Sequence, residues 1–114
     1  MTAFRATLEE LEEADLLLHV VDASAPDLER RMTAVRKVID EIGLAETPEL
    51  LVFNQIDRLP AGVGESIAAR HGGVAVSALK RTGLELLLAR AEAILWEEEE
   101  TGPRRALAVA ARGG

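Results

Sequence analysis

The chain alternates short apolar runs with amphipathic stretches along most of its length. Residues 15–22 and 49–54, DLLLHVVD and ELLVFN, are nearly continuous apolar runs, and residues 74–77 form a shorter one. Such runs are typical of strands that are covered on both faces, as in a parallel sheet. The pattern therefore predicts three buried strands.

Four stretches around these strands repeat apolar residues every three or four positions, which is typical of amphipathic helices. They cover residues 3–13, 28–42, 65–71 and 84–96. We expect Ser24 to cap the second of these helices and Trp96 to cover the core beside the last. The residues of the last helix that are expected to face inward are Leu84, Leu87, Leu88, Ala91, Ile94 and Leu95. Alternating helices and strands predict an α/β fold of three layers, with about three parallel strands joined by right-handed crossovers.

The composition changes near the C-terminus. Four acidic residues, 97–100, are followed by Gly102-Pro103 and then by a segment of Ala, Arg and Gly with little periodicity. We therefore divide the chain into a domain over residues 1–97 and an acidic run with a disordered tail over residues 98–114.

Composition excludes several classes of function. The 114 residues suffice for one domain, and 20 acidic against 13 basic residues give a net charge of −7. That balance argues against a broad nucleic-acid interface. The chain has no cysteine, so disulfides, thiolate catalysis and cysteine-ligated metals are excluded. No apolar run reaches the length of a membrane span, and no signal peptide is evident, so we expect a cytoplasmic protein without a membrane partner.

Polar residues follow each predicted strand. Asp22-Ala23-Ser24 follows the first, residues 54–57 (NQID) the second, and residues 77–80 (SALK) the third. The carboxyl ends of parallel strands share one edge of the sheet, and ligands bind there in open α/β folds. This edge is therefore the predicted site.

The segments 54–57 and 77–79 resemble the guanine-recognition motifs of GTPases, Asn-Lys-x-Asp and Ser-Ala-x. Guanine presents a ring N–H and an exocyclic amine side by side, and one carboxylate accepts both, which assigns base specificity to Asp57. The resemblance further implies that Asn54 bridges the base edge and the neighbouring loops, and that the Ala78 N–H donates to the guanine carbonyl while Ser77 braces the loop. Gln55 replaces the commoner lysine and would cover one face of the base without a charge. Leu79 or Lys80 would cover the other face.

A longer stretch is similar to one particular family. Residues 3–10 (AFRATLEE), 14–24 (ADLLLHVVDAS), 74–78 (VAVSA) and 82–84 (TGL) look like the HflX family of ribosome-associated GTPases. The similarity covers about residues 3–96 and implies the C-terminal part of a P-loop NTPase-like G domain. It further implies GTP or GDP as the ligand and the large ribosomal subunit as the partner.

Other parts of a GTPase are missing from the sequence. A phosphate-binding loop has the pattern Gly-x-x-x-x-Gly-Lys-Ser/Thr, and neither Lys37 nor Lys80 follows a glycine. We therefore expect no catalytic residue and no metal ligand in this chain, Mg²⁺ only with the missing half, and no activity for the chain alone. Without the strand that would precede it, strand 16–22 is expected to be an exposed edge through which the chain self-associates.

The remaining polar candidates have simpler interpretations. His19 is expected to be a hydrogen-bonded structural histidine, and Asp22 a structural acid at a strand end. His71 ends a predicted helix, where a cation interacts favourably with the helix dipole. The alternative to a guanine site is a non-catalytic interaction module, or a truncated gene product that binds no nucleotide.

Overall fold

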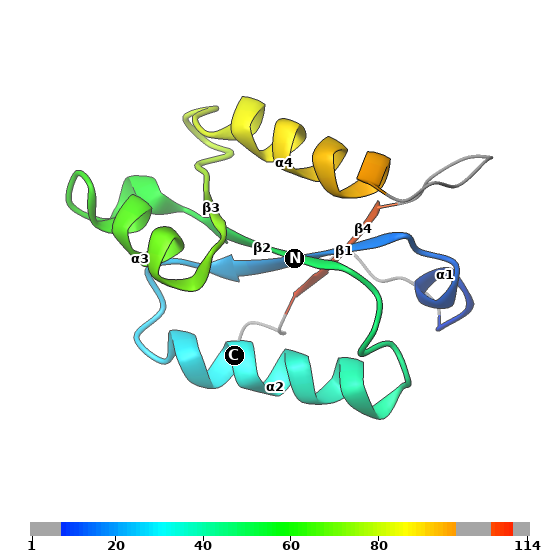
Figure 1. Cartoon of the computed structure of the whole chain (residues 1–114). Helices are drawn as coiled ribbons and strands as arrows, with labels where there is room; N and C mark the ends of the chain where they lie inside the picture. The colour runs from blue at the N-terminus through cyan, green and yellow to red at the C-terminus, as the bar shows by residue number, and fades with distance from the viewer. Residues whose placement is uncertain (1–7, 98–105, 111–114) are drawn as a thin grey trace.

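The computed structural model describes residues 8–97 and 106–110, and in this part of the chain the fold is a helix-covered parallel sheet (Figure 1). Four parallel strands are arranged in the order β3-β2-β1-β4. The elements in chain order are α1 (Leu8–Glu12), β1 (Leu16–Asp22), α2 (Leu28–Glu41), β2 (Glu49–Asn54), the 3₁₀ turn η1 (Ile56–Arg58), α3 (Val63–His71), β3 (Val74–Ala75), α4 (Leu84–Glu97) and β4 (Ala106–Ala110).

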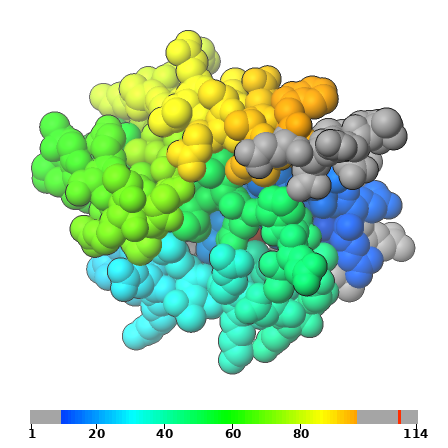
Figure 2. All heavy atoms as spheres, in the orientation of Figure 1, coloured from blue at the N-terminus to red at the C-terminus, as the bar shows by residue number. Residues whose placement is uncertain are grey.

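Helices cover both faces of the sheet and give three layers. Leu16 of β1 packs with β2 and β3 residues against α4, whereas its neighbour Leu17 packs against Val35 and Ile39 of α2. Successive residues of a strand point to opposite faces, so one continuous apolar run supplies both layers of the core. In the space-filling view, α2, α3 and α4 surround the middle of the molecule and leave little of the sheet visible (Figure 2). The predicted α/β class with a parallel sheet is confirmed.

The edge of the sheet differs from the prediction. Ala106–Ala110, in the segment expected to be a disordered tail, forms a strand that pairs in parallel with β1. The register runs from Leu16 opposite Ala106 to Val20 opposite Ala110. The expectation that strand 16–22 is an exposed edge open to self-association is therefore wrong, because β1 lies between β2 and β4. Strand β4 contains no charged residue. Its backbone pairs with the N–H and C=O groups of β1 that do not face β2.

Helix α4 buries a narrower stripe than expected. Leu87, Ala91, Ile94 and Leu95 pack against the core. Leu88 is 64% exposed and Trp96 is 73% exposed, so both of these predictions are wrong, and Leu84 is also exposed. Each residue of a helix is turned by about 100° from the one before, which places Leu88 at the margin of the stripe that is centred on Leu87, Ala91 and Ile94.

Among the described residues, no helix combines the length and the apolar character that crossing a membrane requires.

Candidate guanine-binding site

Backbone pairing between β2 and β3 positions the two candidate loops side by side. The predicted third strand, 74–77, is assigned only over Val74–Ala75, but its pairing continues one residue further. The Val76 N–H donates to the Phe53 carbonyl at 2.8 Å, and the Ile56 N–H donates to the Val76 carbonyl at 3.3 Å. Asn54–Asp57 therefore leaves the sheet directly beside Ser77.

The second loop is closed by its own hydrogen bonds. Ser77 and Thr82 exchange backbone hydrogen bonds of 3.0 and 3.1 Å, and the Lys80 N–H donates to Ser77 Oγ at 3.0 Å. Gly83 follows with φ of 79°, and a Cβ at this position would lie 2.1 Å from the Ala75 carbonyl oxygen. Only glycine fits there, so this residue lets the chain turn from the loop into α4.

Asp57 is held by the neighbouring loop. The buried hydroxyl of Ser77 donates to Asp57 Oδ1 at 2.7 Å, while the carboxylate itself remains exposed. This hydrogen bond lowers the pKa of Asp57, and the nearby charges of Lys80 and Arg58 act in the same direction against partial desolvation. A carboxylate has about four acceptor sites, so Asp57 keeps the capacity to accept further hydrogen bonds.

Asn54 links the two loops. Its Oδ1 accepts the Gln55 N–H at 2.7 Å and the Ala78 N–H at 3.2 Å. The sequence indicated that Asn54 bridges neighbouring loops but not that it pairs with Ala78. The Ala78 N–H is therefore held next to Asn54, and its hydrogen bond is the longer and the more exposed of the two.

Gln55 and Leu79 complete the predicted set. Gln55 has φ of 65°, in the left-handed region that is uncommon for residues other than glycine. Its side-chain Oε1 is buried without a hydrogen-bond partner among the described residues. Leu79 is 80% exposed at the tip of the second loop, so it is available to contact a ligand.

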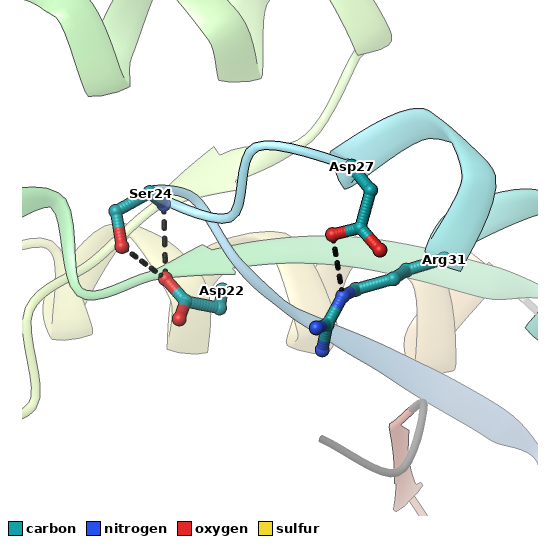
Figure 3. A network of polar contacts seen from close by, with 4 residues as sticks. All are labelled: Asp22, Ser24, Asp27 and Arg31. Carbon is teal, nitrogen blue, oxygen red and sulfur yellow. Dashed lines mark hydrogen bonds and ion pairs between the residues drawn. The ribbon is translucent and has the colours of Figure 1, made fainter. Parts of the chain in front are cut away.

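The loop after β1 is organised separately (Figure 3). Asp22 Oδ1 accepts hydrogen bonds from the Ser24 N–H at 2.9 Å and from Ser24 Oγ at 2.7 Å. The residue preceding α2 is Asp27, whose carboxylate pairs with Arg31 at 2.8 Å. The prediction that Ser24 caps this helix is wrong, because α2 begins at Leu28 and its N-cap residue is Asp27.

His19 has a structural environment. Its Nδ1 lies 2.6 Å from Glu49 Oε2, and Arg36 of α2 lies 2.8 Å from Glu49 Oε1. The hydrogen bond with His19 lowers the pKa of Glu49, and burial opposes that effect. These three residues join β1, β2 and α2. The part of the chain that the structure describes contains no group of three His, Cys, Asp or Glu residues suited to a metal ion.

No protein-family model matches the chain. Curated relatives do match it. GTPase HflX of Caldanaerobacter subterraneus subsp. tengcongensis is 41% identical over 101 residues, which cover 86% of this chain and 22% of that protein. The chain belongs to the HflX family. GTPase HflX of Magnetococcus marinus is 46% identical over 89 residues, and that of Escherichia coli is 48% identical over 59 residues. These two alignments cover 77% and 52% of this chain, and 21% and 14% of the respective relatives.

The chain spans about a fifth of the length of the Caldanaerobacter and Magnetococcus relatives, and less of the Escherichia coli one. The family assignment rests on this part alone. It agrees with the resemblance that the strand and loop residues suggested.

Proposed function

We propose that this chain supplies the guanine-recognition part of a nucleotide site in an HflX-type GTPase, and that it corresponds to the C-terminal part of the G domain. The observation that carries the proposal is the hydrogen bond from Ser77 to Asp57. It fixes an ionised carboxylate beside the Ala78 N–H, which Asn54 holds in place.

The donor and acceptor set suits guanine. Asp57 would accept the ring N–H and the exocyclic amine together, which is a charge-assisted bidentate pair. The Ala78 N–H would exchange its 3.2 Å bond to Asn54 for the guanine carbonyl oxygen. Adenine has no ring N–H at that edge, so it would leave the carboxylate unpaired.

The residues of this chain fit the base of GTP or GDP but not the phosphates. The sequence contains no Gly-x-x-x-x-Gly-Lys-Ser/Thr, the loop whose backbone N–H groups bind phosphates and whose hydroxyl binds Mg²⁺. We therefore assign phosphate binding, Mg²⁺ binding and GTP hydrolysis to other parts of an HflX protein. We also propose that the partner of the complete protein is the large ribosomal subunit and that it acts in the cytoplasm.

Titration of the ¹⁵N-labelled chain with nucleosides tests base recognition. Guanosine should shift the amide signals of Ala78 and Gln55 with a dissociation constant near millimolar, because phosphate and Mg²⁺ contacts are missing. Adenosine should not. Asp57→Asn should favour xanthosine over guanosine, because xanthine carries a carbonyl in place of the amine.

Asp22→Asn is the matched control, since Asp22 ends the neighbouring strand and takes no part in the loop contacts. It should keep the preference for guanosine. Equal binding of guanosine and adenosine by the unaltered chain, or no change in base preference with Asp57→Asn, would contradict the proposal.

A further inference from the structure

An open cavity of about 240 Å³ lies beside the polar contacts of His19, on the face of the sheet that α2 covers. It is lined by His19, Glu49 and Leu51 from the sheet and by Met32, Thr33 and Arg36 from α2. Glu49 is the first residue of β2, whereas the candidate guanine-binding loops begin at Asn54, its last residue. The cavity is therefore separate from these loops.

One carboxylate oxygen at this cavity receives no hydrogen bond. The Glu49 side chain is only 8% exposed, and its Oε2 lies 2.6 Å from His19 Nδ1. Its Oε1 is buried, and Arg36 Nη2 lies 2.8 Å from it without the alignment that a hydrogen bond requires. A buried acceptor without a donor is unfavourable, and such a group in a folded protein calls for an explanation.

Arg36 is free to move away from this oxygen. Its side chain is 53% exposed, and within the described residues it takes part in an ion pair with Glu49 but in no hydrogen bond. An ion pair of a largely exposed side chain contributes little to stability, so a ligand displaces the guanidinium at little cost. A displaced guanidinium can stack on the face of an aromatic ring.

The charges around the cavity favour an uncharged ligand. The bond with His19 lowers the pKa of Glu49, so this carboxylate is ionised at neutral pH. An anion would be repelled by Glu49, and a cation would have to replace Arg36 as its partner. An uncharged N–H donor has neither cost, because it bonds to Oε1 while Arg36 stays close.

We propose that this cavity binds an uncharged, planar aromatic compound of two fused rings that carries one N–H donor, such as an indole. A cavity of about 150 Å³ accommodates a single benzene ring, so the larger volume here suits two fused rings. The N–H donates to Glu49 Oε1, and the rings pack against Met32 and Leu51. A thioether beside an aromatic ring is a favourable contact, and Arg36 stacks on the open face.

Titrations of the ¹⁵N-labelled chain with indole and 1-methylindole test this proposal. Indole should shift the amide signals of Thr33 and Leu51, but not that of Ala78, with a dissociation constant near millimolar for so small a ligand. 1-Methylindole has the same rings without the donor and should bind about tenfold more weakly, because a hydrogen bond to a charged group is lost. Equal binding of the two compounds, or no shift of the Thr33 and Leu51 signals with indole, would overturn the proposal.

Glu49→Gln tests the acceptor. A hydrogen bond to a neutral acceptor is roughly half as strong as one to a charged acceptor, so the advantage of indole over 1-methylindole should fall to about threefold. Glu46→Gln is the matched control, since Glu46 is an exposed acid that does not line the cavity, and the tenfold advantage should remain. An undiminished advantage in Glu49→Gln would assign the N–H to another acceptor and overturn the contact.

A pair of neighbouring positions on α2 tests the location without changing a buried residue. Thr33 and Ala34 are both exposed, but only Thr33 lines the cavity. Thr33→Trp should block indole binding, whereas Ala34→Trp should leave it unchanged. Equal binding of indole by the two variants would place the ligand elsewhere. These outcomes do not depend on guanosine binding, so failure here leaves the guanine-binding site intact, and failure of that site leaves this proposal intact.

Discussion

At the scale of single residues, the two polar residues that are buried as a whole among the described residues each have a hydrogen-bond partner elsewhere in the fold. Among the described residues, His19 and Ser77 are the buried polar ones. His19 bonds to Glu49 on the next strand, and Ser77 bonds to Asp57 across the two candidate loops. Desolvated polar groups are unfavourable unless they are hydrogen-bonded, so both pairs fix the register of their neighbours.

The bond from Ser77 controls the charge of Asp57. Because its pKa is lowered, Asp57 stays ionised above its ordinary value of 3.8, and the charge is lost only when the pH falls through the lower folded pKa. Ser77→Ala removes the main cause and should raise the pKa of Asp57, so that the carboxylate protonates at a higher pH. NMR titration of the Asp57 carboxyl carbon measures this.

Ser24→Ala is the control for this titration, because it removes a similar serine–aspartate bond at Asp22 and leaves Ser77 in place. It should not move the titration of Asp57. An unchanged Asp57 titration in Ser77→Ala would show that Lys80 and Arg58, rather than the hydroxyl, hold the charge.

At the scale of elements, the loop that carries Ser77 and Ala78 depends on one glycine at its end. A Cβ on Gly83 would overlap the Ala75 carbonyl, and the residue has a positive φ as well. The close approach is to backbone on the β3 side, which no side-chain rotation relieves. The geometry of the site therefore depends on where α4 begins.

Gly83→Ala should destabilise the fold by about 3 kcal/mol, from the overlap and the strained φ together. Gly43→Ala is the matched control. Gly43 has φ of 85° but open space where a Cβ would lie, so only the conformational cost of about 1 kcal/mol applies. Urea denaturation measures both, and equal losses would contradict the overlap.

Helix α4 offers a second comparison between adjacent leucines. Leu87 packs against the core, whereas Leu88 is mostly exposed. Leu87→Ala should cost about 2 kcal/mol of unfolding free energy, and Leu88→Ala less than about 0.5 kcal/mol. Denaturant midpoints of the two variants decide this, and a larger loss from Leu88 would mean that α4 is rotated about its axis.

At the scale of the whole molecule, β4 determines how the sheet ends. The order β3-β2-β1-β4 reverses direction at β1, so α4 crosses the face opposite to α2 and α3 (Figure 1). This is the arrangement of a doubly wound sheet. Val109 of β4 adds to the cluster of Leu17, Val35 and Ile39 under α2.

Removal of residues 98–114 tests the pairing of β4 through hydrogen exchange in β1. The Leu17 and Ala23 N–H groups donate to Pro48 and Asn54, on the β2 side. Because N–H directions alternate along a strand, the amides of Leu18 and Val20 face β4.

In the shortened chain, the Leu18 and Val20 amides should lose protection, whereas those of His19 and Val21 should keep it. The His19 and Val21 amides are the control, because they lie in the same strand but face β2. Loss at all four amides would mean that the sheet unfolds as a whole, and unchanged protection at Leu18 and Val20 would contradict the pairing with β4. Light scattering should also show more self-association, because β1 then becomes an apolar edge.

The sequence by itself determined the strands β1 and β2, the helix α2 between them, and the two polar loops that follow β2 and β3. These features depend on the local periodicity of apolar residues and on where the apolar runs end, and both can be recognised from residues that are close together in the sequence. The family resemblance could also be read from the sequence, because the stretches AFRATLEE, ADLLLHVVDAS, VAVSA and TGL carry it.

The tertiary structure alone decided which pieces meet. The pairing of β4 with β1 and the bond between Asn54 and Ala78 each depend on contacts between segments whose own patterns did not predict them. A five-residue stretch of Ala, Leu and Val has weak preference on its own, and it becomes a strand because β1 offers unpaired backbone groups beside it.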